Sequence, residues 1–354
     1  MKTASRYIAK HVVLGMIIST LVLLPLFSFF DLLDQLDAVG IGTYQTRDAF
    51  LYVIMLMPRR FIQIAPFIAL LGTVGALGKL AVNLELVALR VAGMSPIQIS
   101  MVPVGVGLSL LLIIGLMEQS VAPQLQQSAI ALRATALERT AELGKGLGIW
   151  TRDEHNILRI GEILPGNRAV DVEIMFFDER GFLATHTHAK FADNLDSELW
   201  KLNDVTVRTF TEKNIALASA SSVEWQSFLK AEDIATLTKP PESLSPLELI
   251  RHTEFLQATG QKADAYLMAL WRKVGGALMT IAMILLAIPF IFGLVREGLG
   301  AKLILAAVVG VSVYLLDQII ANAGLLLHMN VILTAILPSL TLIVLAIIWL
   351  RRIF

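Results

Sequence analysis

Ionisable side chains interrupt several long apolar runs of this sequence, and they are the first candidates for chemistry. Asp317 and its neighbour Gln318 lie within one of these runs. Because burying a carboxylate there is costly, Asp317 is a candidate for a functional role. Asp317 could carry protons or serve as a base, or it could make a structural hydrogen bond to a neighbouring helix. Glu118 is a second possible base. Because no nucleophile or metal set converges on either carboxylate, the pattern disfavours an enzyme.

Two other patterns are weak. His186 and His188 share one face of a predicted strand and could ligate a metal, but the chain has no cysteine and no third ligand stands nearby. Ordinary surface histidines are the favoured interpretation. The sequence also lacks the phosphate-binding GxxxxGK[ST] pattern, so any ATP-driven work requires another chain.

The composition predicts a membrane protein. The chain has 354 residues, of which 56% are hydrophobic, and its mean hydropathy is +0.70. Six apolar runs are long enough to cross a bilayer as helices. They cover residues 12–30, 50–80, 97–121, 267–294, 301–326 and 331–350.

Charge is distributed unevenly along the chain. Residues 124–264 hold 15 Lys and Arg against 21 Asp and Glu, whereas the rest hold 14 against 8. Basic residues cluster at the N-terminus, in residues 79–90 and 296–302, and at Arg351 and Arg352. If the chain crosses the membrane six times, all four clusters lie on the same side of it. The positive-inside rule predicts that this side, with both termini, is cytoplasmic and that the acidic insert lies outside.

In the insert between the third and fourth apolar runs, the spacing of apolar residues changes to the alternation that is typical of β-strands. Residues 1–123 and 265–354 contain three spans each, and residues 124–264 contain about seven short alternating segments with flanking helices. We therefore predict an α-helical membrane protein with six transmembrane helices and an inserted all-β, jellyroll-like domain. Its inward-pointing candidates are all apolar: Ile149, Ile157, Ile160, Ile174, Phe176, Trp200 and Val207.

A short apolar helix is predicted at about residues 83–95, between the second and third runs. It is too short to span a bilayer. Asn83 is its expected N-cap, and Gly93 with Pro96 is expected to end it. Its charges, Glu85 and Arg90, are too far around the helix to pair. Such a helix needs another protein to cover it, or else it lies on the lipid surface.

Three short stretches resemble one known family. They are Glu85-Leu86-Val87 with Ala92-Gly93, Val121-Ala122-Pro123, and Phe292-Gly293 before Arg296. Together they resemble the lipopolysaccharide export permease family, LptF/LptG (the YjgP/YjgQ type), over essentially the whole chain. The stretch 314–319 and Trp271-Arg272-Lys273 resemble the LptG branch.

The resemblance implies one of two pseudo-symmetric permeases of an ABC exporter in the Gram-negative inner membrane, with a periplasmic β-jellyroll. The implied partners are an LptF-type permease, an LptB ATPase dimer that uses ATP and Mg, LptC, the periplasmic bridge protein LptA and the substrate lipopolysaccharide, with no nucleic acid. The chain itself is expected to bind no cofactor. The ATPase is expected to meet the short helix at Glu85, Leu86, Leu89, Arg90 and Gly93.

The resemblance also implies a lipid-binding cavity. Leu26, Phe27, Phe30 and Phe67 would meet acyl chains, and Arg59, Arg60 and Arg133 would meet the acidic head group. Two departures affect this expectation. Leu294 replaces a usual proline, and Asp31, Asp34 and Asp37 stand where members often carry lysines. The alternatives are a proton-coupled transporter that relies on Asp317, or a lipid-modifying membrane enzyme.

Overall fold

The computed structural model describes residues 2–353, except 138–148, 165–167, 194–198, 212–213, 229–238, 260, 294–297 and 328. The chain divides into two compact units. The helical unit comprises Met1–Val39, Gln45–Ala129 and Asp264–Phe354, and the β-unit comprises Gly40–Tyr44 and Ile130–Ala263. Leu294 and Arg296, which entered the family resemblance, lie outside the described residues.

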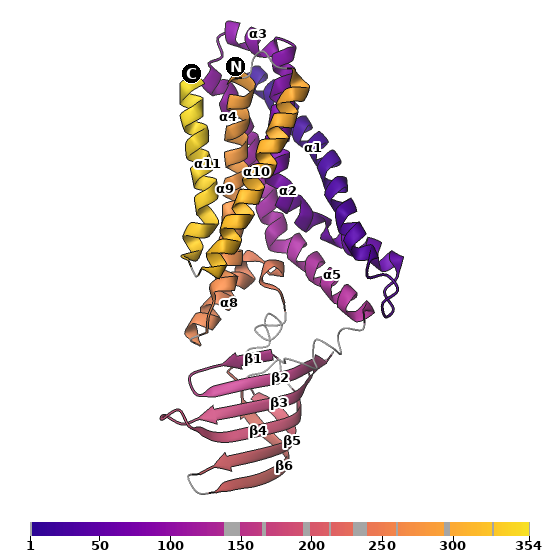
Figure 1. The fold of residues 1–354 in the computed structure, drawn as a ribbon, viewed down its shortest axis with the longest axis vertical. Helices are drawn as coiled ribbons and strands as arrows, with labels where there is room; N and C mark the ends of the chain where they lie inside the picture. The colour runs from indigo at the N-terminus through magenta and orange to yellow at the C-terminus, as the bar shows by residue number, and fades with distance from the viewer. Residues whose placement is uncertain are drawn as a thin grey trace. The chain divides into compact units, whose positions relative to one another are not determined.

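The described residues contain six helices long and apolar enough to cross a membrane, which confirms the six predicted spans. Figure 1 shows them side by side. They are α1 (Lys2–Leu36), α2 (Thr46–Val82), α4 (Pro96–Leu116), α9 (Asp264–Gly293), α10 (Leu299–Leu326) and α11 (Val331–Ile353). The third span continues without a break through the π-helical segment η1 (Met117–Val121) into α5 (Ala122–Ala136).

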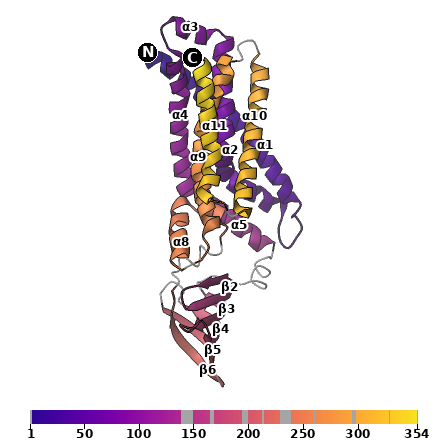
Figure 2. The same ribbon diagram turned by 60° about the vertical axis from the view of Figure 1, so that its left-hand side comes forward.

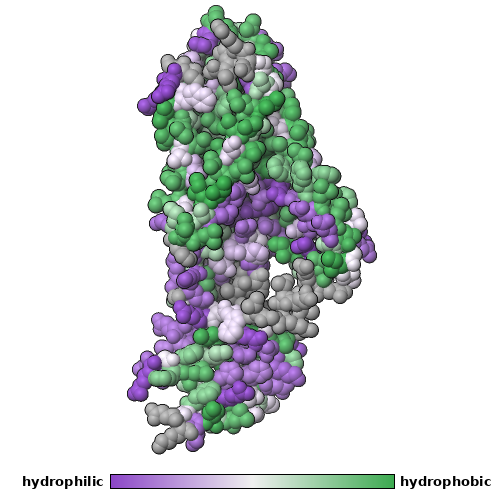
Figure 3. Space-filling model, in the orientation of Figure 1, coloured by the Kyte–Doolittle hydropathy of each residue, from purple (hydrophilic) through white to green (hydrophobic). Residues whose placement is uncertain are grey.

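Helices α2 and α9 form the centre of the helical unit. Within their most apolar windows 67% of the residues are buried, against 11% to 28% in the other four spans. The views in Figures 1 and 2 agree that α4, α10 and α11 surround this pair. The outer spans therefore present apolar side chains outward, and the surface of the helical unit is largely hydrophobic in Figure 3. Such a surface suits contact with lipid tails.

Two glycines let α1 and α2 touch through their backbones. A Cβ atom on Gly72 would lie 2.6 Å from the Cα of Met16, and one on Gly15 would lie 2.3 Å from the carbonyl oxygen of Gly72. Small residues allow such close approach between membrane helices. Ile8 and Val12 of α1 are fully buried beside this contact.

The short helix α3 (Glu85–Val91) forms where it was predicted, but its caps differ. Leu84 occupies the N-cap position with a φ of 63°, and Asn83 instead caps the C-terminus of α2, so that prediction was wrong. Gly93 follows α3 with a φ of 94°. Pro96 opens α4 behind a capping box in which Ser95 accepts from the backbone of Gln98, because proline is favoured at the first helical position.

The β-unit confirms the predicted all-β insert. Its described strands pair antiparallel in one sheet, each beside its neighbour in the chain. They are β1 (Ile149–Arg152), β2 (Asn156–Leu164), β3 (Arg168–Phe177), β4 (Leu183–Asp193), β5 (Leu199–Phe210) and β6 (Ile215–Gln226). This meander is simpler than the expected jellyroll, because the described strands contain no Greek-key crossover.

Two expectations about the insert were wrong. Residues 199–202 and 205–210 were expected to form separate strands but belong to one strand, β5, whose Asp204 takes a left-handed φ of 52°. The described part of the insert therefore has six strands, where about seven segments were expected. Ile157 cannot share a face with the fully buried Leu158 and Ile160, because side chains alternate along a strand. Phe176 was also expected to point inward, but it is 40% exposed.

One face of the sheet carries the core of the β-unit. Its members are buried: Leu158, Ile160, Ala169, Val172, Ile174, Ala189, Ala192, Trp200, Leu202 and Val205. Phe255 of α8 (Pro246–Ala258) packs against this cluster. The 3₁₀ segment η2 (Pro241–Ser243) precedes α8, which begins with a capping box of Ser245 and Glu248.

We predict that Gly72→Ala destabilises the chain by about 1–3 kcal/mol, because the added methyl group would meet backbone atoms that cannot move without separating α1 from α2. Thermal unfolding in detergent measures the effect. Gly105→Ala in α4 is the control, since its Cβ would enter open space and alanine favours a helix. Equal unfolding midpoints in the two variants would contradict the close approach.

Candidate functional site: a charge network across the spans

A network of ionisable side chains connects five of the six spans, and we call it the charge network. It joins α1, α2, the π segment of the third span, α9 and α10. Its members are Asp31, Arg59, Arg60, Glu118, Arg272, Lys273 and Asp317. Four cations and three carboxylates leave one excess positive charge, 4 − 3 = +1.

Glu118 holds the most deeply buried part of the network. Its Oε1 atom accepts from Arg59 Nη1 at 2.8 Å and also from Lys273 Nζ. The side chains of Glu118, Lys273 and Arg59 are 8%, 10% and 16% exposed. One carboxylate therefore holds two cations, from α2 and α9. The Nε atom of Arg59 is buried without an acceptor among the described residues.

The local backbone helps to place Glu118. It lies in η1, the π-helical segment that interrupts the third span. A π turn accommodates an extra residue within an α-helix, and such turns occur frequently at functional sites. This segment could not be predicted from the sequence, because its residues are compatible with an ordinary α-helix.

Arg60 pairs with Asp31 of α1. Arg60 Nε donates to Asp31 Oδ2 at 2.8 Å while Arg60 Nη2 donates to Asp31 Oδ1, and Nη1 donates to Gln63 Oε1 at 2.9 Å. Each of the two arginines that were predicted to meet a lipid head group therefore has a carboxylate partner within the chain. The sequence did not predict this pairing, and head-group binding by these arginines stays a prediction.

The third pair of the network is looser. Arg272 Nη2 lies 3.7 Å from Asp317 Oδ2, and both side chains are about 30% exposed. Asp317 is therefore not an isolated carboxylate, and its neighbour Gln318 is half-buried. Adjacent cations reach different partners, since successive helical residues point about 100° apart. Lys273 thus reaches Glu118 while Arg272 reaches Asp317.

The predicted acyl-chain residues divide by exposure. Phe67 is buried, with its ring 5.6 Å from that of Tyr314, and Phe27 packs partly against the helical core. Leu26 and Phe30 of α1 are 48% and 55% exposed, so they are available to lipid. Arg133 is half-buried and belongs to the β-unit.

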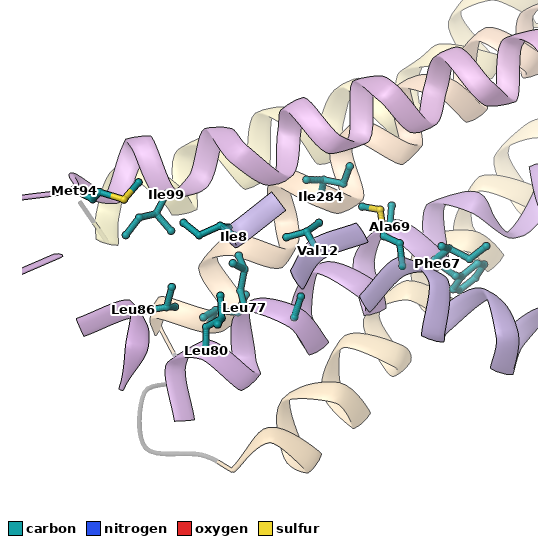
Figure 4. Close-up of a cluster of buried hydrophobic side chains, with 14 of the residues drawn as sticks. Ile8, Val12, Phe67, Ala69, Leu77, Leu80, Leu86, Met94, Ile99 and Ile284 are labelled. Carbon is teal, nitrogen blue, oxygen red and sulfur yellow. The ribbon is translucent and has the colours of Figure 1, made fainter. Parts of the chain in front are cut away.

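Helix α3 presents an apolar surface, although not all of its predicted contact residues face outward. Leu86 is 3% exposed in the helical core, where Figure 4 shows it near Leu77 and Leu80, and Leu89 packs partly against the same cluster. Leu86 is therefore internal. The exposed apolar residues are Leu84, Val87 and Val91, because the helical repeat places them on the other side. Arg90 and Gly93 are exposed.

Glu85 makes two hydrogen bonds at the start of α3. Its carboxylate accepts from the Tyr7 hydroxyl at 2.7 Å and from Asn83 Nδ2 at 3.3 Å. These bonds, that of Tyr7 first, hold the pKa of Glu85 below its usual range. Tyr7 was not singled out by the sequence, since nothing in the sequence places residues 78 positions apart in contact.

The two histidines of the β-unit contact separate carboxylates. His188 lies 2.8 Å from Asp171, and His186 lies 3.3 Å from Glu173. Arg159 donates to both acids, at 3.0 Å and 2.7 Å. The hydrogen bond with His188, assisted by Arg159, keeps the pKa of Asp171 low. The cluster is therefore an ion-pair ladder across three strands.

Six spans, an all-β insert between the third and fourth, and an exposed short helix define a polytopic membrane protein with an extramembrane domain. Residues 6–352 match the model of the family described as lipopolysaccharide export system permease LptF/LptG. The chain belongs to this family, which confirms the resemblance found in the sequence.

Two relatives carry the name lipopolysaccharide export system permease protein LptG. The chain is 30% identical to the protein of Haemophilus influenzae over 345 residues, covering 97% of this chain and 96% of that protein. It is 28% identical to the protein of Escherichia coli K12 over 337 residues, covering 94% of each. The likeness therefore spans both the helices and the insert.

Removal of the Glu118 carboxylate should destabilise the chain strongly. We expect Glu118→Ala to cost about 3–5 kcal/mol, because Arg59 and Lys273 would remain as buried cations without their shared carboxylate. Thermal unfolding of the purified chain measures this cost.

Two further variants test the explanation. The double variant Glu118→Ala with Lys273→Ala should recover part of the loss, since only one cation is then left. Asp317→Ala breaks a longer and more exposed ion pair, so it should lower the stability of the chain less than Glu118→Ala does. A double variant less stable than Glu118→Ala would show that the buried cations left without a carboxylate are not the cause.

Proposed function

We propose that this chain is the permease subunit of an ABC exporter that extracts lipopolysaccharide from the outer leaflet of the inner membrane. The observation that carries the proposal is Arg60 of the charge network, a partly exposed guanidinium paired with one carboxylate among apolar spans, where an anionic head group can reach it. Family membership supports the substrate class. The proposal places the β-unit in the periplasm and both termini in the cytoplasm.

The two arginines have different roles in this proposal. Arg60 is 26% exposed and is paired with one carboxylate, so a phosphate group can approach it and replace Asp31. Arg59 is more buried and shares Glu118 with Lys273, so it maintains the helix arrangement. The exposed Leu26 and Phe30 of α1 would then contact the acyl chains of a lipid whose head group meets Arg60.

Energy would come from a separate ATPase that docks on α3. Val87 and Val91 are 54% and 84% exposed on a helix that is too short to cross the membrane. Figure 1 shows both termini at the α3 end of the helical unit, in agreement with the cytoplasmic side inferred from basic residues. Glu85 and Arg90 would add polar contacts to this apolar surface.

The β-unit would pass the lipid onward. We propose that acyl chains enter between parts of its apolar core and leave towards a periplasmic bridge of the LptA type. The remaining partners in this proposal are an LptF-type permease, an LptB-type ATPase dimer and LptC. A carboxylate-dependent proton transporter is less well supported, because Asp317 has a cationic partner in Arg272.

The exchange of Asp31 for phosphate predicts a gain of affinity. Asp31→Asn should strengthen binding of lipopolysaccharide to the purified chain by about tenfold, because Arg60 no longer has to give up a charged partner. Arg60→Ala should weaken binding. Fluorescence titration with labelled lipopolysaccharide measures both.

Asp34→Asn is the matched control for this experiment. Asp34 is an exposed acid one turn away on the same helix, and its change removes the same charge without touching Arg60. Weaker binding by Asp31→Asn, or an equal gain from Asp34→Asn, would rule out exchange at Arg60.

The docking role of α3 predicts the effect of a charge on its exposed face. Val91→Glu should abolish copurification of the ATPase from membranes, since burying the new carboxylate in an apolar interface is costly. Thr3→Glu adds the same charge at an exposed position near the N-terminus and should retain the ATPase. Retention by both variants would place the ATPase elsewhere.

A further inference from the structure

Helix α1 contacts α3 through a polar and an apolar side chain that are adjacent in sequence. The Tyr7 hydroxyl donates to Glu85 Oε2 at 2.7 Å. The next residue, Ile8, is fully buried in the cluster that also holds Leu86 of α3, as Figure 4 shows. The start of α1 is thus attached to the helix that we assign to ATPase docking.

The opposite end of the same helix reaches the charge network. From Tyr7 to Asp31 the helix rises 24 residues, or about 36 Å at 1.5 Å per residue. Between these points, Gly15 lies against the backbone of Gly72 in α2. Pro25 lies inside α1, where it removes one backbone hydrogen bond and provides a place to bend. One helix therefore joins the α3 contact to the carboxylate that occupies Arg60.

We propose that Tyr7 is a positioning residue that transmits the movement of α3 to α1 through its hydrogen bond with Glu85. This inference rests on the proposed function, in which α3 receives the ATPase. Movement of α1 would displace Asp31 and thereby change the partner available to Arg60. A hydrogen bond to a charged acceptor is short and directional, so it can hold two helices in register where few side chains interdigitate.

The packing around Tyr7 allows its hydrogen bond with Glu85 to be removed without loss of the other contacts of the ring. The tyrosine is 42% exposed, and its ring lies 4.3 Å from that of His11 on the same helix. Tyr7→Phe keeps this ring contact and deletes only the hydroxyl. Asn83→Ala is the matched control, because it deletes the other hydrogen bond to Glu85 but leaves the link to α1 in place.

The first experiment uses the complete transporter, with its ATPase, in proteoliposomes loaded with purified lipopolysaccharide. We expect Tyr7→Phe to lower the lipid extracted per ATP hydrolysed by at least about fivefold, a typical coupling between sites, while ATP hydrolysis and the unfolding midpoint stay near wild type. Asn83→Ala should keep the wild-type ratio. An unchanged ratio in Tyr7→Phe, or an equal fall in both variants, would overturn the proposal.

A purely structural role for Tyr7 has a different signature. It would lower ATP hydrolysis, lipid extraction and the unfolding midpoint together in Tyr7→Phe, and that outcome would also overturn the proposal. The ratio of lipid to ATP separates the two cases, since a structural defect lowers both of its terms.

The second experiment needs no ATPase, so it tests the link even where the proposed function fails. The chain has no cysteine, so spin labels at Lys10→Cys in α1 and Ala92→Cys after α3, both at exposed positions, report the distance between the two helices. In lipid nanodiscs, Tyr7→Phe should broaden the dipolar EPR distance distribution and Asn83→Ala should not. Identical distributions in all three proteins would refute the link, whereas failure of wild type to bind an ATPase would refute only the proposed function.

Discussion

The energetic cost of placing charge among membrane helices is the constraint on which this structure depends. The seven ionisable side chains of the charge network lie in or beside the spans, and each is within ion-pair distance of an opposite charge. A buried charge that loses its partner is strongly destabilising, so the most buried members, Glu118, Arg59 and Lys273, are held most firmly. The network therefore connects α1, α2, α9, α10 and the π segment of the third span, and buried apolar side chains pack between the helices.

The sequence identified most members of this network but not their pairing. Six spans follow from length and hydropathy because a bilayer requires about 20 apolar residues per helix. Arg59, Arg60, Glu118 and Asp317 stood out as charges within apolar runs. Their partners depend on which helices become neighbours, and Glu118 and Lys273 are 155 residues apart. A single sequence contains no information on that choice, so the arginines were predicted to be free for substrate although each is paired.

The periodicity of the sequence predicted which helices and strands form better than it predicted which of their faces are buried. The short helix was predicted, but its apolar composition concealed the division between the internal Leu86 and the exposed Val87 and Val91. In the β-unit, alternation correctly predicted an all-β insert. It could not show that two segments around Asp204 form one strand, because a single left-handed residue interrupts the alternation without ending the ladder. It also could not distinguish a meander from two packed layers, since both have the same repeat.

Arg59 and Arg60 are identical neighbours on one helix, but they have different partners, and the proposed function gives them different roles. A rotation of about 100° per residue turns Arg59 towards Glu118 and Lys273, where three side chains exclude solvent, and Arg60 towards α1, where a single carboxylate meets it. Replacement of Glu118 by an incoming phosphate would disturb three helices at once. Replacement of Asp31 disturbs only α1, the peripheral helix that also carries Tyr7. In the proposed function, an anionic lipid would therefore bind with least disruption at Arg60, in place of Asp31. Helix α1 connects Asp31 to Tyr7 and α3, where the ATPase would dock.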